Sequence, residues 1–271
     1  MRKGSVPAAT FLFIGLIFAV PTVAFEAFDA LAFPGKPDLS TYGLARLETV
    51  YAGDLWDLGE SRDTTPRYEK VVAVVNRVRP STLAWINIEH WPYVVSKTPT
   101  LAAEGIQKYN STINAFNYLA PDVAWGYYCI VPVRDYWRAL QPVESALYKS
   151  WQRDNDYLSG VASRSRILFP SLYTFYPDKA GWVRYALANI AEARRMAGTK
   201  PVYVVLRPTY HESNLALANS YIDREFWRLQ LEVARVADGV VIWQSSATPW
   251  NESAAWWVET KLFLKSMGLA R

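Results

Sequence analysis

The sequence predicts an α/β fold in which parallel strands alternate with helices, most simply a TIM-type (β/α) barrel of seven to eight mostly parallel strands. Segments typical of strands and of helices alternate about six times along the chain, as in parallel sheets with helical crossovers. Several strands end in polar or aromatic residues followed by a loop containing proline, which is where barrel enzymes place their sites. An open, doubly wound sheet is the alternative, but no glycine-rich turn follows the first strand.

The first third of the chain contains two predicted strands and one helix. A lead-in with proline and glycine at 33–40 precedes a loosely alternating segment, 42–51, which could be the first strand. A polar loop follows, and Pro66 suits the first turn of a helix that ends near Val78. The apolar run at 83–88 is typical of a buried strand. Six strands are visible, and the remaining barrel strands could lie between Leu39 and Leu58.

The rest of the chain repeats the same alternation, and proline and glycine mark several boundaries. Pro121 closes one helix, Gly198 ends another, and Asn251 is placed to cap the last. The predicted strands are 123–130, 167–173, 201–206 and 239–243, and the predicted helices are 101–119, 142–161, 181–196, 222–237 and 251–267.

Composition favours one globular domain and does not by itself identify a ligand. The chain has 271 residues, of which 51% are hydrophobic, enough for a large core. The net charge of +4 is dispersed, which argues against a nucleic-acid partner. The 12 Trp and 17 Tyr could stack on sugar rings, although aromatic side chains also build cores.

The N-terminus resembles a secretory signal peptide covering residues 1–24. Arg2 and Lys3 precede an uncharged apolar run at 8–20, and small residues lead to Ala24, where we expect cleavage. A second cleavage site could follow Ala32, and an uncleaved anchor is the alternative. We therefore expect an exported protein, periplasmic or secreted, whose residues 25–271 form a single monomeric barrel domain with no stable membrane span.

Residue types needed for several other chemistries are scarce. The single cysteine, Cys129, lies among apolar residues and is expected to be a buried structural thiol. The two histidines, His90 and His211, have no zinc-site spacing, and neither a phosphate loop nor a GxSxG turn occurs. We expect no metal and no cofactor.

The segment 81–93, STLAWINIEHWPY, is the best candidate for a catalytic strand. Alternation along a strand places Trp85, Asn87 and Glu89 on one face, with the carboxyl group at the end of the apolar run. Glu89 is the candidate catalytic acid, and Asn87 is its candidate partner. A structural carboxylate that meets solvent or an arginine is the alternative for a glutamate at such a position.

Other strand ends supply further candidates if the barrel brings them to one face. A carboxylic acid, an amide, an arginine and aromatic rings together resemble a sugar site, where a carboxyl group protonates the leaving oxygen. The candidate substrate-binding residues are Trp91, Tyr128, Asp135, Tyr173, Arg207, Tyr210, Trp243 and Gln244.

Four short motifs between Leu83 and Ser246 resemble the hyaluronidase family. They are a strand with a carboxylate before Trp-Pro (IEHWP), then FPSLY, PVYVVLR and ADGVVIW. The resemblance implies a distorted (β/α) barrel and a glycan substrate. It gives Glu89 the place of the proton donor and puts Tyr173, Tyr210 and Trp243 on strands that line the sugar site.

The chain departs from that family at Asn87, where the family has an aspartate. The segment AWINIE is similar to endo-β-N-acetylglucosaminidases, which carry an asparagine there. The resemblance implies a retaining, substrate-assisted mechanism in which an N-acetylhexosamine's acetamido oxygen attacks C1. Two alternatives remain: a glycosidase with Asp135 or Glu212 as a second carboxylate, and a barrel that binds a glycan without cleaving it.

Overall fold

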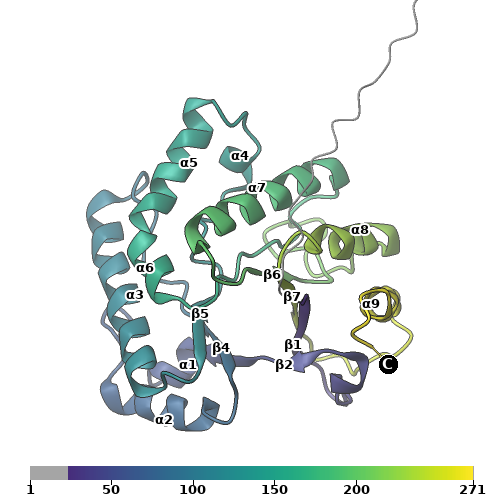
Figure 1. Ribbon diagram of the computed structural model, residues 1–271, viewed down its shortest axis with the longest axis horizontal. Helices are drawn as coiled ribbons and strands as arrows, with labels where there is room; N and C mark the ends of the chain where they lie inside the picture. Colours follow the sequence, from purple (N-terminus) through teal and green to yellow (C-terminus); the bar gives the residue numbers. More distant parts are fainter. Residues whose placement is uncertain (1–23, 271) are drawn as a thin grey trace, which may run out of the picture.

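The computed structural model describes residues 24–270, so the predicted signal peptide lies outside the described residues except for Ala24. Helices surround a central group of parallel strands, as Figure 1 shows. The strands are β1 (Glu26–Ala32), β2 (Ala45–Arg46), β3 (Glu48–Tyr51), β4 (Leu83–Asn87), β5 (Ala124–Tyr127), β6 (Tyr203–Leu206) and β7 (Gly239–Ser245).

The strands form a distorted barrel made of two parallel sheets. One sheet has the order β2-β1-β7-β6 and the other β3-β4-β5. Leu47 alone separates β2 from β3, while isolated bridges such as Tyr128 to Phe169 and Ser171 to Val205 connect β5 through segment 168–171 to β6. The strand segments therefore follow one another in a circuit, and the predicted (β/α) barrel fold is confirmed.

Nine α-helices and one 3₁₀ helix connect the strands in residues 24–270. Side chains cap several of them: Ser145, Asp178 and Asp223 each accept a hydrogen bond from a backbone amide in the first turn. The helices are η1 (Ser40–Tyr42), α1 (Ala52–Leu55), α2 (Tyr68–Val78), α3 (Pro99–Leu119), α4 (Tyr136–Ala139), α5 (Ala146–Tyr157), α6 (Ser159–Arg164), α7 (Lys179–Ala197), α8 (Arg224–Ala234) and α9 (Ala255–Ser266).

The structure corrects four of the predicted elements. Strand β1 was missed: it lies between the apolar N-terminal run and the lead-in at 33–40, where no element was predicted. The predicted strand 167–173 makes only isolated bridges, since Pro170 has no amide to donate. The predicted helix 142–161 is two helices, α5 and α6. Helix α9 begins at Ala255, and Asn251 accepts from the Ser253 amide instead of capping it.

Two hydrophobic clusters follow the alternation of side chains along the strands. Ala84, Ile86 and Ile88 pack outward with the helices, whereas Trp85 belongs to a cluster inside the barrel with Phe28, Tyr128 and Val205. The predicted faces of the 81–93 segment are therefore correct. Because Asn87 and Glu89 follow Trp85 on the same face, their side chains lie at the mouth of the barrel.

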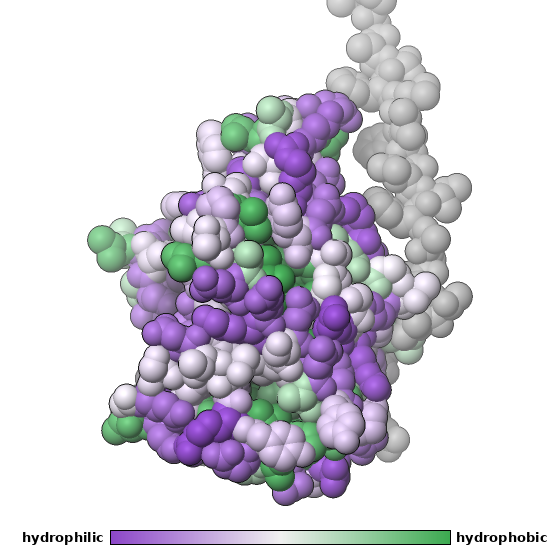
Figure 2. Space-filling model, turned by 90° about the vertical axis from the view of Figure 1, so that its left-hand side faces the viewer, coloured by the Kyte–Doolittle hydropathy of each residue, from purple (hydrophilic) through white to green (hydrophobic). Residues whose placement is uncertain are grey.

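The outer surface is mostly polar. On the face shown in Figure 2, on the side of α3 and α5, hydrophobic residues form small separate patches among hydrophilic ones. Between residues 24 and 270, no helix has the length and hydrophobicity needed to cross a membrane. Cys129 is buried and free, as expected.

Candidate active site

A cavity of about 240 Å³ opens at the carboxyl ends of the strands. The end of β4 contributes three consecutive inward positions to it. Segment 168–174 and β7 contribute one aromatic residue each, and the residues after β5 and β6 contribute the rest. Its lining consists of Trp85, Asn87, Glu89, Tyr128, Arg134, Tyr173, Arg207, His211, Glu212 and Trp243.

Glu89 enters this cavity without a fixed partner. Its carboxyl group makes no ion pair or hydrogen bond with any residue in 24–270. Although its side chain reaches solvent through the mouth, protein surrounds it, and this desolvation raises the pKa of Glu89. The nearby Arg134 lowers that pKa and the carboxylate of Glu212 raises it further. An uncommitted carboxyl group with a raised pKa is suited to proton donation.

Asn87 and Glu89 also border a second, more open cleft of about 480 Å³. Tyr51, Arg62 and His90 lie along it. The carbonyl of Arg62 accepts a hydrogen bond of 2.6 Å from the Trp91 indole, so this loop is held against the end of β4. The acid therefore lies where two clefts meet, and a chain-like ligand could pass it on both sides.

Aromatic rings form one wall of the cavity. Trp85 and Tyr128 have ring centroids 5.1 Å apart, and Tyr173 stacks on Trp243 at 5.9 Å. Burial raises the pKa of Tyr128 and that of Tyr173, so both hydroxyl groups stay protonated and can donate. Such a wall offers flat apolar faces and polar edges, as a pyranose ring requires.

Arg207 and Glu212 form a charged pair on another side of the cavity. The guanidinium donates to the Glu212 carboxylate at 2.7 Å, and its Nε donates to Thr209 and to the amide oxygen of Gln244. Burial alone would raise the pKa of Glu212, but hydrogen bonds from its own backbone and from Arg207 outweigh it and lower the pKa. The pKa values of the two carboxyl groups are therefore shifted in opposite directions, that of Glu212 down and that of Glu89 up.

Arg134 is a cavity residue that sequence reasoning missed. It has no acidic partner among the described residues, and its guanidinium lies 5.7 Å from the Phe175 ring centroid. Its backbone is fixed on one side, where the Val133 amide donates to Asn155 and the Val133 carbonyl accepts from Trp151, both at 2.7 Å. The signal was a cation in the loop VPVRDYW, directly before the candidate Asp135.

Four of the predicted substrate residues do not line the cavity. Trp91 is buried behind β4 against Trp56 and Tyr109. Tyr210 belongs to the outer core, and Gln244 supports Arg207 from behind. The other six predicted catalytic and substrate residues, including Asn87 and Glu89, all line it.

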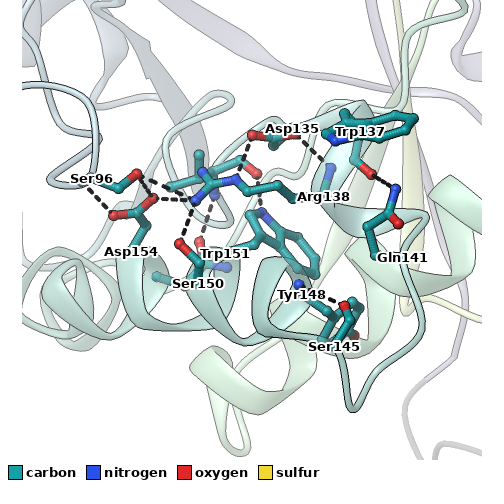
Figure 3. A network of polar contacts seen from close by, with 12 residues as sticks. Ser96, Asp135, Trp137, Arg138, Gln141, Ser145, Tyr148, Ser150, Trp151 and Asp154 are labelled. Carbon is teal, nitrogen blue, oxygen red and sulfur yellow. Dashed lines mark hydrogen bonds and ion pairs between the residues drawn. The ribbon is translucent and has the colours of Figure 1, made fainter.

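The fourth, Asp135, caps α4 and binds Arg138 at 2.7 Å (Figure 3). The same guanidinium donates to Asp154, also at 2.7 Å, and Asp154 accepts from the amide of Ser96. This buried network ties the loop after β4 to α4 and α5. Asp135 therefore holds the framework of the site and does not face the cavity.

Replacing Arg138 with leucine is expected to lower the free energy of unfolding by about 3–5 kcal/mol, because the buried Asp154 and the half-buried Asp135 lose their counter-charge. Urea unfolding measures this change. Lys149→Ala removes an exposed pair with Glu144 and should cost less than about 1 kcal/mol. A loss as small for Arg138→Leu as for this control would show that the network contributes little.

Among residues 24–270, no group of three or more His, Cys, Asp or Glu side chains could hold a metal ion. Burial lowers the pKa of His211, which favours its neutral ring, and its Nδ1 lies 2.9 Å from the hydroxyl of Ser213. The chemistry available is thus that of two carboxyl groups, Glu89 with a raised pKa and Glu212 with a lowered one, together with hydroxyl groups and two arginines.

A family model described as hyaluronidase, of the glycoside hydrolases, matches residues 94–265, more than half of the chain. The chain belongs to this family. This hyaluronidase-family chain is accordingly a glycoside hydrolase. The match begins after Glu89, so the place of the acid rests on the geometry at the end of β4 and not on the matched segment. Comparison with curated protein sequences found no match.

Solved structures support the same fold. Bee venom hyaluronidase in complex with a hyaluronic acid tetramer has a TM-score of 0.59 at 14% identity, covering 90% of this chain and 96% of that one. A second structure of the bee venom enzyme gives 0.58 at 14% identity, covering 91% and 98%. A glucosidase from Croceicoccus marinus gives 0.52 at 8% identity, covering 90% and 68%.

Proposed function

We propose that the protein is an exported hydrolase of glycans that contain N-acetylhexosamine, and that it retains the anomeric configuration by substrate assistance. Glu89 protonates the leaving oxygen and then activates water as a base. Asn87 orients the acetamido group, whose carbonyl oxygen attacks C1. The observation that carries the proposal is the position of Glu89. This desolvated carboxyl group has no hydrogen-bond partner among residues 24–270 and lies with Asn87 at the junction of two clefts.

The charges of the cavity favour a substrate that also carries carboxylates. Arg134 faces the cavity without an acidic partner, and a guanidinium matches the geometry of a carboxylate. Hyaluronan, the ligand named for the bee venom enzyme, combines carboxylates with N-acetylhexosamine.

Release of new reducing ends from hyaluronan, chitin oligosaccharides, peptidoglycan, N-glycans and neutral glucans tests the proposal. Cleavage of neutral glucans alone would overturn it.

A two-carboxylate mechanism is the second candidate, favoured by the ionised Glu212 in the same cavity as Glu89. In that mechanism Glu212 would act directly as nucleophile or base. Its ion pair with Arg207 at 2.7 Å lowers its nucleophilicity, which is why we prefer substrate assistance.

The surroundings of Glu89 predict opposite pH shifts for two neutralising variants. A general acid must be protonated, so kcat/KM should fall as pH rises through the raised pKa of Glu89. Arg134→Gln removes a charge that lowers this pKa and should move the alkaline limb to higher pH. Glu212→Gln removes a charge that raises it and should move the limb to lower pH. Shifts of the same sign in both pH profiles would exclude Glu89 as the group observed.

The proposal of export is based on the N-terminal segment. The position of β1 limits where this segment can be cleaved without loss of a strand. Strand β1 begins at Glu26 and lies between β2 and β7. Cleavage after Ala24 keeps every described strand, whereas cleavage after Ala32 would remove β1. N-terminal sequencing of the exported protein should therefore find Phe25 as the first residue, and an intact Met1 would indicate a retained anchor.

A further inference from the structure

The aromatic lining does not stop at the cavity. Phe175 follows the bridging segment 168–174, and its ring lies 4.8 Å from the ring of the cavity residue His211. Tyr136 of α4 lies 6.3 Å from Phe175 and 5.4 Å from Tyr176, measured between ring centroids. Ring-to-ring contacts therefore run without a break from the cavity to Tyr176, whose side chain is 53% exposed.

Two contacts support this row of rings, Phe175, Tyr136 and Tyr176, from behind. Tyr136 packs on the buried Tyr185 with ring centroids 4.8 Å apart and an interplanar angle of 30°. The carbonyl of Phe175 accepts a hydrogen bond of 2.7 Å from the Asn214 side chain. An exposed ring on a fixed support can bind a flat partner with little loss of conformational freedom.

We propose that Phe175 and Tyr176 form a distal subsite that binds sugar rings of the same glycan chain beyond the residues held in the cavity. The inference rests on the proposed function. The row is continuous with the cavity and lies on the carboxyl-end loops, on which barrel enzymes build their sites. The more open cleft with Tyr51 and Arg62 is a separate extension from Glu89, so a polymer passing the acid can extend onto both surfaces.

The occupant is a glycan and not an apolar peptide because the surroundings of the row are polar. Pro177 and Asp178 follow Tyr176 and are exposed, and the guanidinium of Arg134 lies 5.7 Å from the Phe175 ring on the cavity side. Ring faces bordered by polar groups match a pyranose, which has one apolar face and hydroxyl groups at its edge.

Binding to an inactive variant tests the subsite apart from catalysis. In a Glu89→Gln background, affinity is measured for hyaluronan polymer and for hyaluronan tetrasaccharide, with and without Tyr176→Ala. We expect Tyr176→Ala to weaken polymer binding about three- to tenfold and tetrasaccharide binding less than about twofold. The matched control is Tyr118→Ala: this tyrosine is 82% exposed at the C-terminal end of α3, which leads to the opposite end of the barrel. The control should change neither affinity.

The outcomes separate the subsite from the reaction. Equal weakening for both probes, or no change, would overturn the distal subsite. Length-dependent weakening together with wild-type protein that cleaves no glycan would support the subsite and contradict the proposed hydrolysis. Failure of the Glu89→Gln protein to bind either probe would overturn the subsite for hyaluronan, whereas the proposed hydrolysis is decided by the release of reducing ends.

Discussion

Replacing Glu89 with glutamine is expected to lower kcat by about 10²–10⁴-fold, the usual contribution of a general acid–base. The amide keeps the size of the side chain but cannot protonate a leaving oxygen. It should not disturb the fold, because the Glu89 carboxyl group makes no hydrogen bond or ion pair within residues 24–270. Removal of a desolvated titratable group should leave the free energy of unfolding equal or slightly higher at neutral pH.

Kinetics with the best glycan substrate and urea unfolding of the same preparations check both expectations. Glu104→Gln is a matched control, since Glu104 is exposed on α3 and contributes to neither cleft. Its kcat should equal that of the wild type. Full activity in Glu89→Gln would show that this residue does not take part in the mechanism. If Glu89→Gln does not fold, Glu89→Asp is the replacement test, because it keeps a carboxyl group but shortens the side chain by one methylene and should also lower kcat.

Replacing Asn87 with alanine is expected to lower kcat by about 10²–10³-fold, the cost of removing one fixed group that stabilises a transition state. In the proposed mechanism the Asn87 amide holds the acetamido group while its oxygen attacks C1. Aspartate at this position, as in the family pattern, can hold the same group and balance the positive charge that develops on it. Asn87→Asp should therefore restore the activity that alanine loses.

The aspartate variant carries a second, independent signature. A carboxylate beside Glu89 should raise the pKa of Glu89 further and move the alkaline limb of kcat/KM to higher pH. Steady-state kinetics across pH for the wild type, Asn87→Ala and Asn87→Asp separate the two effects. Equal kcat values for alanine and asparagine would show that position 87 does not act on the substrate.

Much of the site could be predicted because strand alternation is a local property. The apolar run Leu83–Ile88 placed Trp85, Asn87 and Glu89 on one face, and the structure puts that face inside the barrel mouth. Strand ends are also local signals, so Tyr128, Tyr173, Arg207 and Trp243 were found in the same way. The short motifs that resemble the hyaluronidase family include several of these positions as well.

What could not be predicted depends on contacts between distant segments. Arg134 and Asp135 are neighbours in one loop, and only the packing of α5 decides which of them faces the cavity. Strand β1 carries Glu26 and Asp29 beside an apolar leader, and it is recognisable as a strand only through its pairing with β7. Segment 167–173 has the sequence pattern of a strand, yet Pro170 limits it to isolated bridges.

The requirement for the substrate's own acetamido group tests the central claim most directly. The measurement compares initial rates of reducing-end release from hyaluronan, or from the N-acetylated glycan that the protein cleaves fastest, before and after chemical removal of the acetyl groups. We expect the N-acetylated glycan to be cleaved and its de-N-acetylated form to react at least about 10²-fold more slowly, since the nucleophile is missing. Equal rates on both forms would contradict substrate assistance and assign the reaction to two protein carboxylates.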